Sequence, residues 1–181
     1  MASYYYLVAS LPMLRFDADP PLDPEDFLSA CRQSVSKHDF ELIESVVSGS
    51  HDGSAVHNRF IGRWNTFLGT LGESLHEHRA ANLGLTDESG KAHADRDPRV
   101  DETVRSAMQA ENPLEAELIL LRLKWDMAGT LGESHVFDVE VLLTYAIQLL
   151  ILERKARFVP MEGNAEFKHL FSNLQSIIKS I

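Results

Sequence analysis

The chain has 181 residues, of which 44% are hydrophobic, and it carries a net charge of −10. This length suits one compact domain with a core of its own, and the few scattered basic residues exclude the basic stripe typical of proteins that bind nucleic acid or anionic lipid. The single cysteine, Cys31, excludes an intrachain disulfide, suits a reducing compartment and is expected to be a buried, inert thiol.

Periodic apolar residues predict helices along almost the whole chain. The first stretch, YYYLVASL, fits a short helix that Pro12 ends, and its alternation also fits a strand. Asp23, followed by a proline, is a good N-cap for the next helix. Ser36 is expected to cap a third helix, which Gly49 ends.

A long helix is expected over 55–83, because apolar residues there recur at steps of three and four. These residues are Val56, Phe60, Trp64, Phe67, Leu71 and Leu75. The polar stretch that follows predicts a flexible loop near 84–98. We expect a single helical domain over 1–181, in which this loop separates an N-terminal part (1–83) from a C-terminal helical part (99–181).

The C-terminal part predicts four further helices. The first is the acidic, amphipathic segment DPRVDETVRSAMQA, and the second covers 113–128, starting behind the capping residue Asn112 and ending at Gly129. Asp138 is expected to cap a very apolar helix over 139–157, and a last helix ends the chain over 167–181. The sequence therefore predicts an all-α fold, an irregular multi-helix bundle of about seven or eight helices.

The longest apolar stretch, at 136–152, is interrupted by four polar residues and is expected to be a buried helix. A membrane span needs about 18 or more uninterrupted apolar residues. The first residues also lack the positively charged opening of a signal peptide. We therefore expect a cytoplasmic protein without direct membrane insertion.

The hexamer GTLGES occurs twice, at Gly69–Ser74 and at Gly129–Ser134. A phosphate-binding loop needs its glycines between a strand and a helix, and neither copy has that setting. We interpret the first copy as a helix interior and the second as a helix stop, so one string adopts two conformations. Because a glycine inside a helix costs about 1 kcal/mol relative to alanine, we interpret Gly62, Gly69 and Gly72 as points of close helix contact.

Two Glu-x-x-His pairs are candidate metal ligands: Glu73 with His76, and Glu166 with His169. This spacing puts both side chains on one helix face, and di-iron helical bundles use two such pairs with two further glutamates. The further glutamates could be drawn from Glu44, Glu117 and Glu140. The alternative interpretation is that these residues are solvated surface groups, since the apolar stripes turn His76 and Glu166 toward the flanks.

No pattern marks a catalytic centre or a cofactor. No serine lies in a Gly-x-Ser-x-Gly setting, and carboxylates scattered over helix surfaces do not define an acid–base pair. We therefore expect no catalytic residue, no cofactor and no enzymatic activity.

Two consecutive stretches carry a family resemblance. PLEAELILLRLKWDMAGTL, followed after a short loop by FDVEVLLTYAIQLLILERKAR, resembles a helical unit repeated in the C-type subunit of the V/A-type ATPases, the helical socket that seats the central stalk. Glu140 stands at the glutamate of the second helix pattern, and Arg154 stands near its basic end. The Asp and Asn positions of that pattern are not clearly kept. FLSACRQSVSKHDFELIESV and YYYLVASL resemble the family's short helical pair and its tyrosine-rich first helix.

Most of the chain is also similar to a bacterial family of unknown function that is encoded beside V-type ATPase subunits. These resemblances imply a non-catalytic subunit or accessory protein of a rotary, ion-transporting ATPase, a helical adaptor that docks its stalk subunits. They imply a cytoplasmic protein that reaches the inner membrane only through a complex. Glu140 and Arg154 are candidate partner-binding residues, and the alternative is that they make ordinary polar contacts within the protein or with solvent. The chain is shorter than the C-type subunit, which leaves an assembly role open. The alternatives are a di-metal helical-bundle oxidoreductase and a generic helical scaffold.

Overall fold

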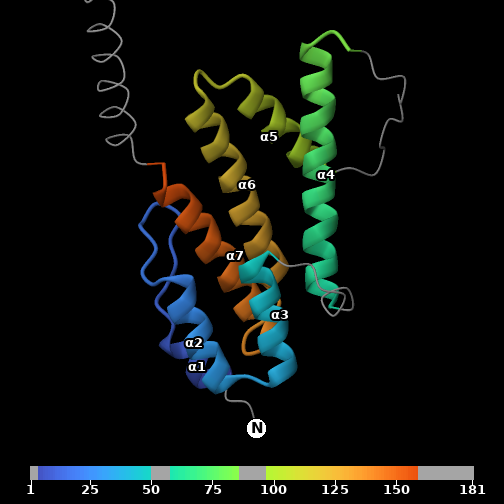
Figure 1. Cartoon of the computed structure of the whole chain (residues 1–181). Helices are drawn as coiled ribbons and strands as arrows, with labels where there is room; N and C mark the ends of the chain where they lie inside the picture. Colours follow the sequence, from blue (N-terminus) through green and yellow to red (C-terminus); the bar gives the residue numbers. More distant parts are fainter. Residues whose placement is uncertain (1–3, 50–57, 86–96, 159–181) are drawn as a thin grey trace, which may run out of the picture.

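The computed structural model describes residues 4–49, 58–85 and 97–158, and all regular structure in these ranges is α-helical (Figure 1). The helices are α1 (Tyr4–Ser10), α2 (Pro24–Ser34), α3 (Lys37–Ser48), α4 (Arg59–Asn82), α5 (Pro98–Met108), α6 (Pro113–Gly132) and α7 (Val139–Ala156). This confirms the predicted all-α multi-helix fold. The first segment, for which the sequence also allowed a strand, is the helix α1. The predicted helix over 167–181 and most of the loop near 84–98 lie outside the described residues.

Polar residues predicted as caps set the starts of several helices. The side chains of Ser36, Asn112 and Asp138 each accept a hydrogen bond from a backbone N–H three residues later, which satisfies a donor that the first helical turn leaves open. Asp23 precedes α2 in the extended cap conformation, but its side chain makes no capping hydrogen bond. The long helix α4 starts behind the cap Asn58, and residues 55–57 of its predicted range lie outside the described residues.

Two clusters of apolar side chains hold the helices together. The larger cluster surrounds α7, which contacts α1, α2, α3 and α6. Its fully buried residues include Phe27, Cys31, Ile43, Leu121, Leu142, Leu143 and Leu149. The smaller cluster joins α4 to α5 through Phe67, Leu71, Val100 and Val104. Because α6 packs against both α5 and α7, it connects the two clusters, and α6 and α7 run through the middle of the molecule (Figure 1).

The connection between α1 and α2 contacts the two central helices, α6 and α7. The hydroxyl of Tyr145 donates a hydrogen bond to the backbone oxygen of Pro12 at 3.0 Å, and the ammonium of Lys155 donates to the backbone oxygen of Phe16. The Phe16 ring also packs edge-on against Trp125, with ring centroids 5.7 Å apart. These contacts give a segment without regular structure a fixed path over α6 and α7.

The predicted end of α6 at Gly129 is wrong, because the helix continues to Gly132. Packing against α7 explains the continuation. A Cβ atom added at Gly132 would lie 3.1 Å from both Cβ and Cγ2 of Thr144, and closer still to Oγ1 of that residue. Glycine at this position therefore lets the last turn of α6 approach α7, and this packing outweighs the low helix propensity of glycine.

The predicted reason for the glycines of α4 is also wrong. Among the described residues, a Cβ atom added at Gly62, Gly69 or Gly72 would meet no atom within 4 Å outside its own helix backbone. These glycines face open space, and nothing in the structure explains them. The four letters GTLG are helical in both copies of the repeated hexamer, so the interpretation of one string in two conformations holds only for the last two letters of the second copy.

Burial of weakly acidic groups predicts a loss of stability in alkali. Desolvation raises the pKa of Cys31 to about 12 from an ordinary value of 9.0, and it also raises the pKa of Tyr145 to about 12. Both groups stay protonated in the fold at a pH where the unfolded chain releases its protons, so their contribution is complete below about pH 9 and is lost as the pH rises toward 12. Urea unfolding at pH 8 and at pH 10.5 is expected to show this loss, and a Tyr145→Phe variant should show a shallower one. An unchanged free energy of unfolding in alkali would contradict the prediction.

None of the described helices is long and apolar enough to cross a membrane.

Candidate functional site

The candidate metal residues are only partly covered by the structure. Glu73 and His76 lie on the exposed face of α4, and Glu166 and His169 lie outside the described residues. Two of the glutamates that could complete a set are paired with arginines, since Glu44 lies 3.8 Å from Arg32 and Glu117 lies 2.7 Å from Arg154. A di-metal site built from the Glu-x-x-His pairs therefore stays a hypothesis, and its second pair is not described.

The two copies of GTLGES do not have the geometry of a phosphate loop. An anion is bound by the free backbone N–H groups at a helix N-terminus. Gly69–Ser74 lies inside α4, and Gly129–Ser134 covers the C-terminal end of α6, where the helix dipole is negative. Neither copy presents free N–H groups at the start of a helix.

Glu140 and Arg154, the candidate partner-binding residues, lie at opposite ends of α7. They are 14 residues apart, which at a rise of about 1.5 Å per residue separates them by about 21 Å along the helix. Arg154 pairs with Glu117 of α6, whereas a carboxylate oxygen of Glu140 lies 4.0 Å from the ring of His135. Each residue thus has a contact within the protein, and the structure does not bring the two together in one site.

Half-buried Lys124 of α6 lies near the pair of Glu117 and Arg154. Desolvation lowers the pKa of the Lys124 ammonium, the charge of Glu117 acts in the opposite direction, and the charge of Arg154 lowers the pKa further. The ion pair of Glu117 and Arg154 links the N-terminal part of α6 to the C-terminal turn of α7. None of the three lines a cavity described here.

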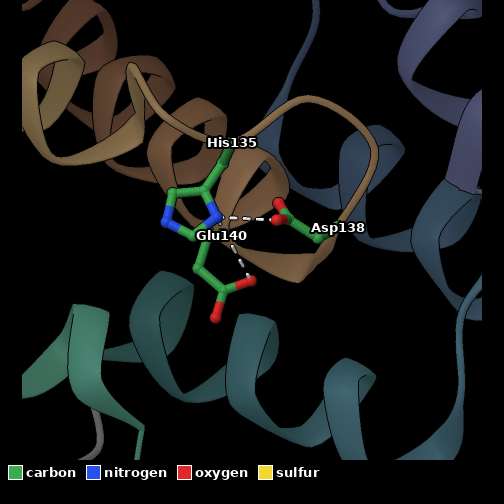
Figure 2. A group of neighbouring side chains, drawn as sticks. All are labelled: His135, Asp138 and Glu140. Carbon is green, nitrogen blue, oxygen red and sulfur yellow. Dashed lines mark hydrogen bonds and ion pairs between the residues drawn. The ribbon is translucent and has the colours of Figure 1, made fainter.

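The connection between α6 and α7 brings three potential ligand side chains together, as Figure 2 shows. His135 follows the end of α6, and its backbone N–H donates to the carbonyl oxygen of Gly132 at 2.9 Å. Asp138 is the N-cap of α7, and Glu140 lies in the first helical turn. Nδ1 of His135 lies 2.6 Å from Oδ2 of Asp138 and 4.0 Å from Oε2 of Glu140. We call these three residues the His135 cluster.

A cavity of about 330 Å³ lies beside the His135 cluster. Its lining residues are Arg59, Phe60, Arg63, Leu131, Ser134, His135 and Glu140. Arg59 and Arg63 lie one turn apart at the start of α4, and within the described residues neither forms an ion pair. The cavity is therefore lined by two apolar side chains, two cationic groups and one carboxylate, besides Ser134 and His135.

An exposed aromatic patch lies at the same connection. We define it by Tyr5, Tyr6, Val136 and Phe137, whose exposed fractions are 57%, 74%, 61% and 48%. The ring of Tyr5 contacts Phe137 with centroids 4.9 Å apart, and it contacts Tyr6 at 5.5 Å. The patch joins α1 to the α6–α7 connection, and the residues on either side of Val136 and Phe137 belong to the His135 cluster.

Neither the His135 cluster nor the aromatic patch is predicted by the sequence patterns. Asp138 is marked there only as a helix cap, and His135 lies in a connection where no helical period relates it to Glu140. The spacing His-x-x-Asp-x-Glu is the one available signal, and it becomes meaningful only when the turn that brings the three together is known. Tyr5 and Phe137 are 132 positions apart in the chain, so no local pattern could join them.

Comparison of the chain with protein-family models, with curated proteins and with solved structures finds no match.

Proposed function

We propose that this protein is a non-catalytic helical adaptor that docks the stalk subunits of a bacterial V-type ATPase. The aromatic patch of Tyr5, Tyr6, Val136 and Phe137 is the observation that carries the proposal. The resemblance of α6 and α7 to the helical unit of the C-type subunit, and of YYYLVASL to its tyrosine-rich first helix, supports the choice of partner. Two of the resembling segments, the first helix and the start of α7 with its preceding residues, contribute the patch itself.

The chemistry of the patch suits a protein partner. The ring of Tyr5 contacts those of Tyr6 and Phe137 at the surface while much of each ring stays in water, and contiguous exposed apolar patches mark interaction sites. Tyrosine is enriched in protein interfaces and at their energetic centres, because it combines a large apolar ring with a polar tip. Exposure of Tyr6 at 74% leaves most of its ring available for burial by another chain.

Charge near the patch favours an acidic partner segment. The chain carries a net charge of −10, and yet Arg59 and Arg63 face the cavity beside the His135 cluster without an ion pair among the described residues. Complementary charges at the rim of an interface steer association and fix its orientation. We therefore expect the partner to present apolar side chains to the patch and carboxylates to these two arginines.

Variants of the patch test the proposal. Tyr6→Ala and Phe137→Ala are each expected to weaken binding to purified stalk subunits by about tenfold or more, since truncation of a central aromatic residue typically costs over about 1.4 kcal/mol of binding free energy. Titration calorimetry or surface plasmon resonance would measure the dissociation constants, after co-purification from the native organism has identified the stalk component that binds.

Leu83→Ala provides the matched control for these variants. Leu83 is as exposed as Tyr6, at 74%, but it lies at the far end of α4, which spans about 36 Å at a rise of about 1.5 Å per residue. Its truncation should leave binding unchanged. The proposal fails if the tagged protein brings down no stalk or head component, or if Leu83→Ala weakens binding as much as the patch variants do.

A further inference from the structure

We propose that His135, Asp138 and Glu140 form a binding site for one zinc ion. Each side chain offers one ligand atom, and the three atoms all lie within 4.8 Å of one another. The site shares no residue with the two Glu-x-x-His pairs. It is also independent of the proposed adaptor role, because its ligands all come from this chain.

The two distances from the His135 ring lie on either side of the separation expected for the ligands of a tetrahedral ion. Zinc lies about 2.0–2.2 Å from nitrogen and oxygen ligands, which places two ligands of a tetrahedron about 3.3 Å apart. Nδ1 of His135 lies 2.6 Å from the carboxylate oxygen of Asp138 and 4.0 Å from that of Glu140, so one separation is below this value and the other above it. The first separation would have to lengthen, and the second to shorten, by about 0.7 Å each, which requires the ring to move away from Asp138 and toward Glu140. In Figure 2 both contacts run from the same ring nitrogen, so the ion would take the place between the two carboxylates.

The backbone on both sides of the site is held in place. The two carboxylate oxygens of Asp138 have different partners. Oδ1 accepts the capping hydrogen bond from the backbone N–H of Val141 at 3.3 Å, and Oδ2 faces His135. His135 is anchored through its backbone to Gly132, at the close contact between α6 and α7. A ligand set that is held before the ion arrives loses less conformational entropy on binding.

Exposure and the neighbouring cavity allow an ion to enter. The side chains of His135, Asp138 and Glu140 are 32%, 42% and 23% exposed, so the cluster is half-buried but open to solvent. His135 and Glu140 also line the cavity of about 330 Å³. A fourth position on the ion would border this cavity, where water or an anion could complete the tetrahedron with Arg59 and Arg63 nearby.

The donor set selects among metal ions. One imidazole nitrogen with two carboxylate oxygens suits Zn²⁺, which accepts nitrogen and oxygen ligands in a four-coordinate site. Mg²⁺ and Ca²⁺ are hard cations that bind through oxygen ligands, so the imidazole nitrogen of His135 favours Zn²⁺ over both of them. The two carboxylates balance the charge of the ion and offset the repulsion from the two arginines, which lie too far from Glu140 to form an ion pair.

Zinc titration of the metal-free, full-length protein tests this proposal. Calorimetry should show one site of micromolar or tighter affinity, with one zinc per chain in native mass spectra, and excess Mg²⁺ should not compete. His135→Gln and Glu140→Gln should each weaken zinc binding by at least about tenfold, because each removes a direct ligand. Asp138→Asn should weaken it similarly while the helix stays intact, since asparagine caps a helix as well as aspartate does.

His76→Gln is the matched control, because His76 is an exposed histidine on α4 with a glutamate at i−3. Its replacement should leave the affinity unchanged. In thermal unfolding, zinc at about one hundred times its dissociation constant for the unaltered chain should raise the ratio of folded to unfolded protein by about one hundredfold in that chain, and by about tenfold or less in Asp138→Asn. The proposal is overturned if the unaltered chain binds no zinc, in which case His135 serves only to hold the helix cap, or if His135→Gln binds it with undiminished affinity.

Discussion

Replacement of Gly132 by alanine is expected to lower the free energy of unfolding by about 1–2 kcal/mol. An added methyl group in a packed contact costs about 1–3 kcal/mol, and alanine returns up to about 1 kcal/mol through its better helix propensity. The backbone at Gly132 has no positive φ and accepts alanine without strain. The contact with α7 therefore decides whether the substitution lowers or raises the free energy of unfolding.

The contact cannot be relieved by a simple rotation of the opposing side chain. The added Cβ would meet Cβ and Cγ2 of Thr144 at 3.1 Å, with Oγ1 closer still, so every rotamer of this β-branched residue keeps an atom near the new methyl group. The hydroxyl of Thr144 also donates to the backbone oxygen of Glu140 at 2.9 Å, which holds its present rotamer. Relief requires α6 and α7 to move apart, with loss of packing along both helices.

The repeated hexamer supplies a control at the matching position. Gly72 holds the same place in the first copy as Gly132 does in the second, and a Cβ atom there would meet nothing within 4 Å in the part of the chain that the structure describes. Gly72→Ala should therefore raise the free energy of unfolding by about 0.5–1 kcal/mol. Urea unfolding under identical conditions measures the change in the free energy of unfolding of each variant. A stabilising effect of Gly132→Ala would contradict the close contact.

A second substitution tests whether Thr144 is the cause. Combined with Thr144→Ala, the Gly132→Ala change should lose much of its cost, because the smaller side chain removes both γ atoms from the contact. A double-mutant cycle should give a coupling free energy of about 1 kcal/mol or more between the two sites. A coupling free energy near zero would show that the added Cβ atom clashes with a residue other than Thr144.

The starts of the helices could be predicted from the sequence for a physical reason. Asn112 and Asp138 satisfy backbone donors a few residues away, so their effect is local and visible in a short window of sequence. The apolar stripe of α4 is equally local, and its members Phe60, Phe67 and Leu71 are buried as expected. Such features depend on neighbours along the chain and not on the tertiary fold.

The end of α6 and the candidate site could not be predicted in this way. Glycine at 129 and 132 is a helix stop by local propensity, and only contact with α7 makes continuation favourable. The His135 cluster needs the turn between α6 and α7, and the aromatic patch needs α1 to pack beside that turn. Both sites are products of tertiary packing.

Truncation of Phe27 to alanine is expected to have the largest effect on stability, a loss of about 3–5 kcal/mol. The side chain is fully buried and stacks on Tyr145, with ring centroids 5.2 Å apart. Its removal would leave a cavity between α2 and α7 and take away the support for the ring whose hydroxyl holds Pro12. Because domains of this size are stable by about 5–15 kcal/mol, chemical denaturation should show a much lower midpoint.

Phe137→Ala separates this effect from partner binding. Phe137 is 48% exposed and its ring contact is with Tyr5, itself a surface residue, so its truncation should change the free energy of unfolding by less than about 1 kcal/mol. Under the proposed function the two variants have opposite effects. The Phe27→Ala variant is less stable, but its folded molecules keep their affinity for the stalk subunits. The Phe137→Ala variant keeps its stability and loses affinity for the stalk subunits. If Phe137→Ala unfolds as readily as Phe27→Ala, the ring belongs to the core and the aromatic patch is not a surface reserved for a partner.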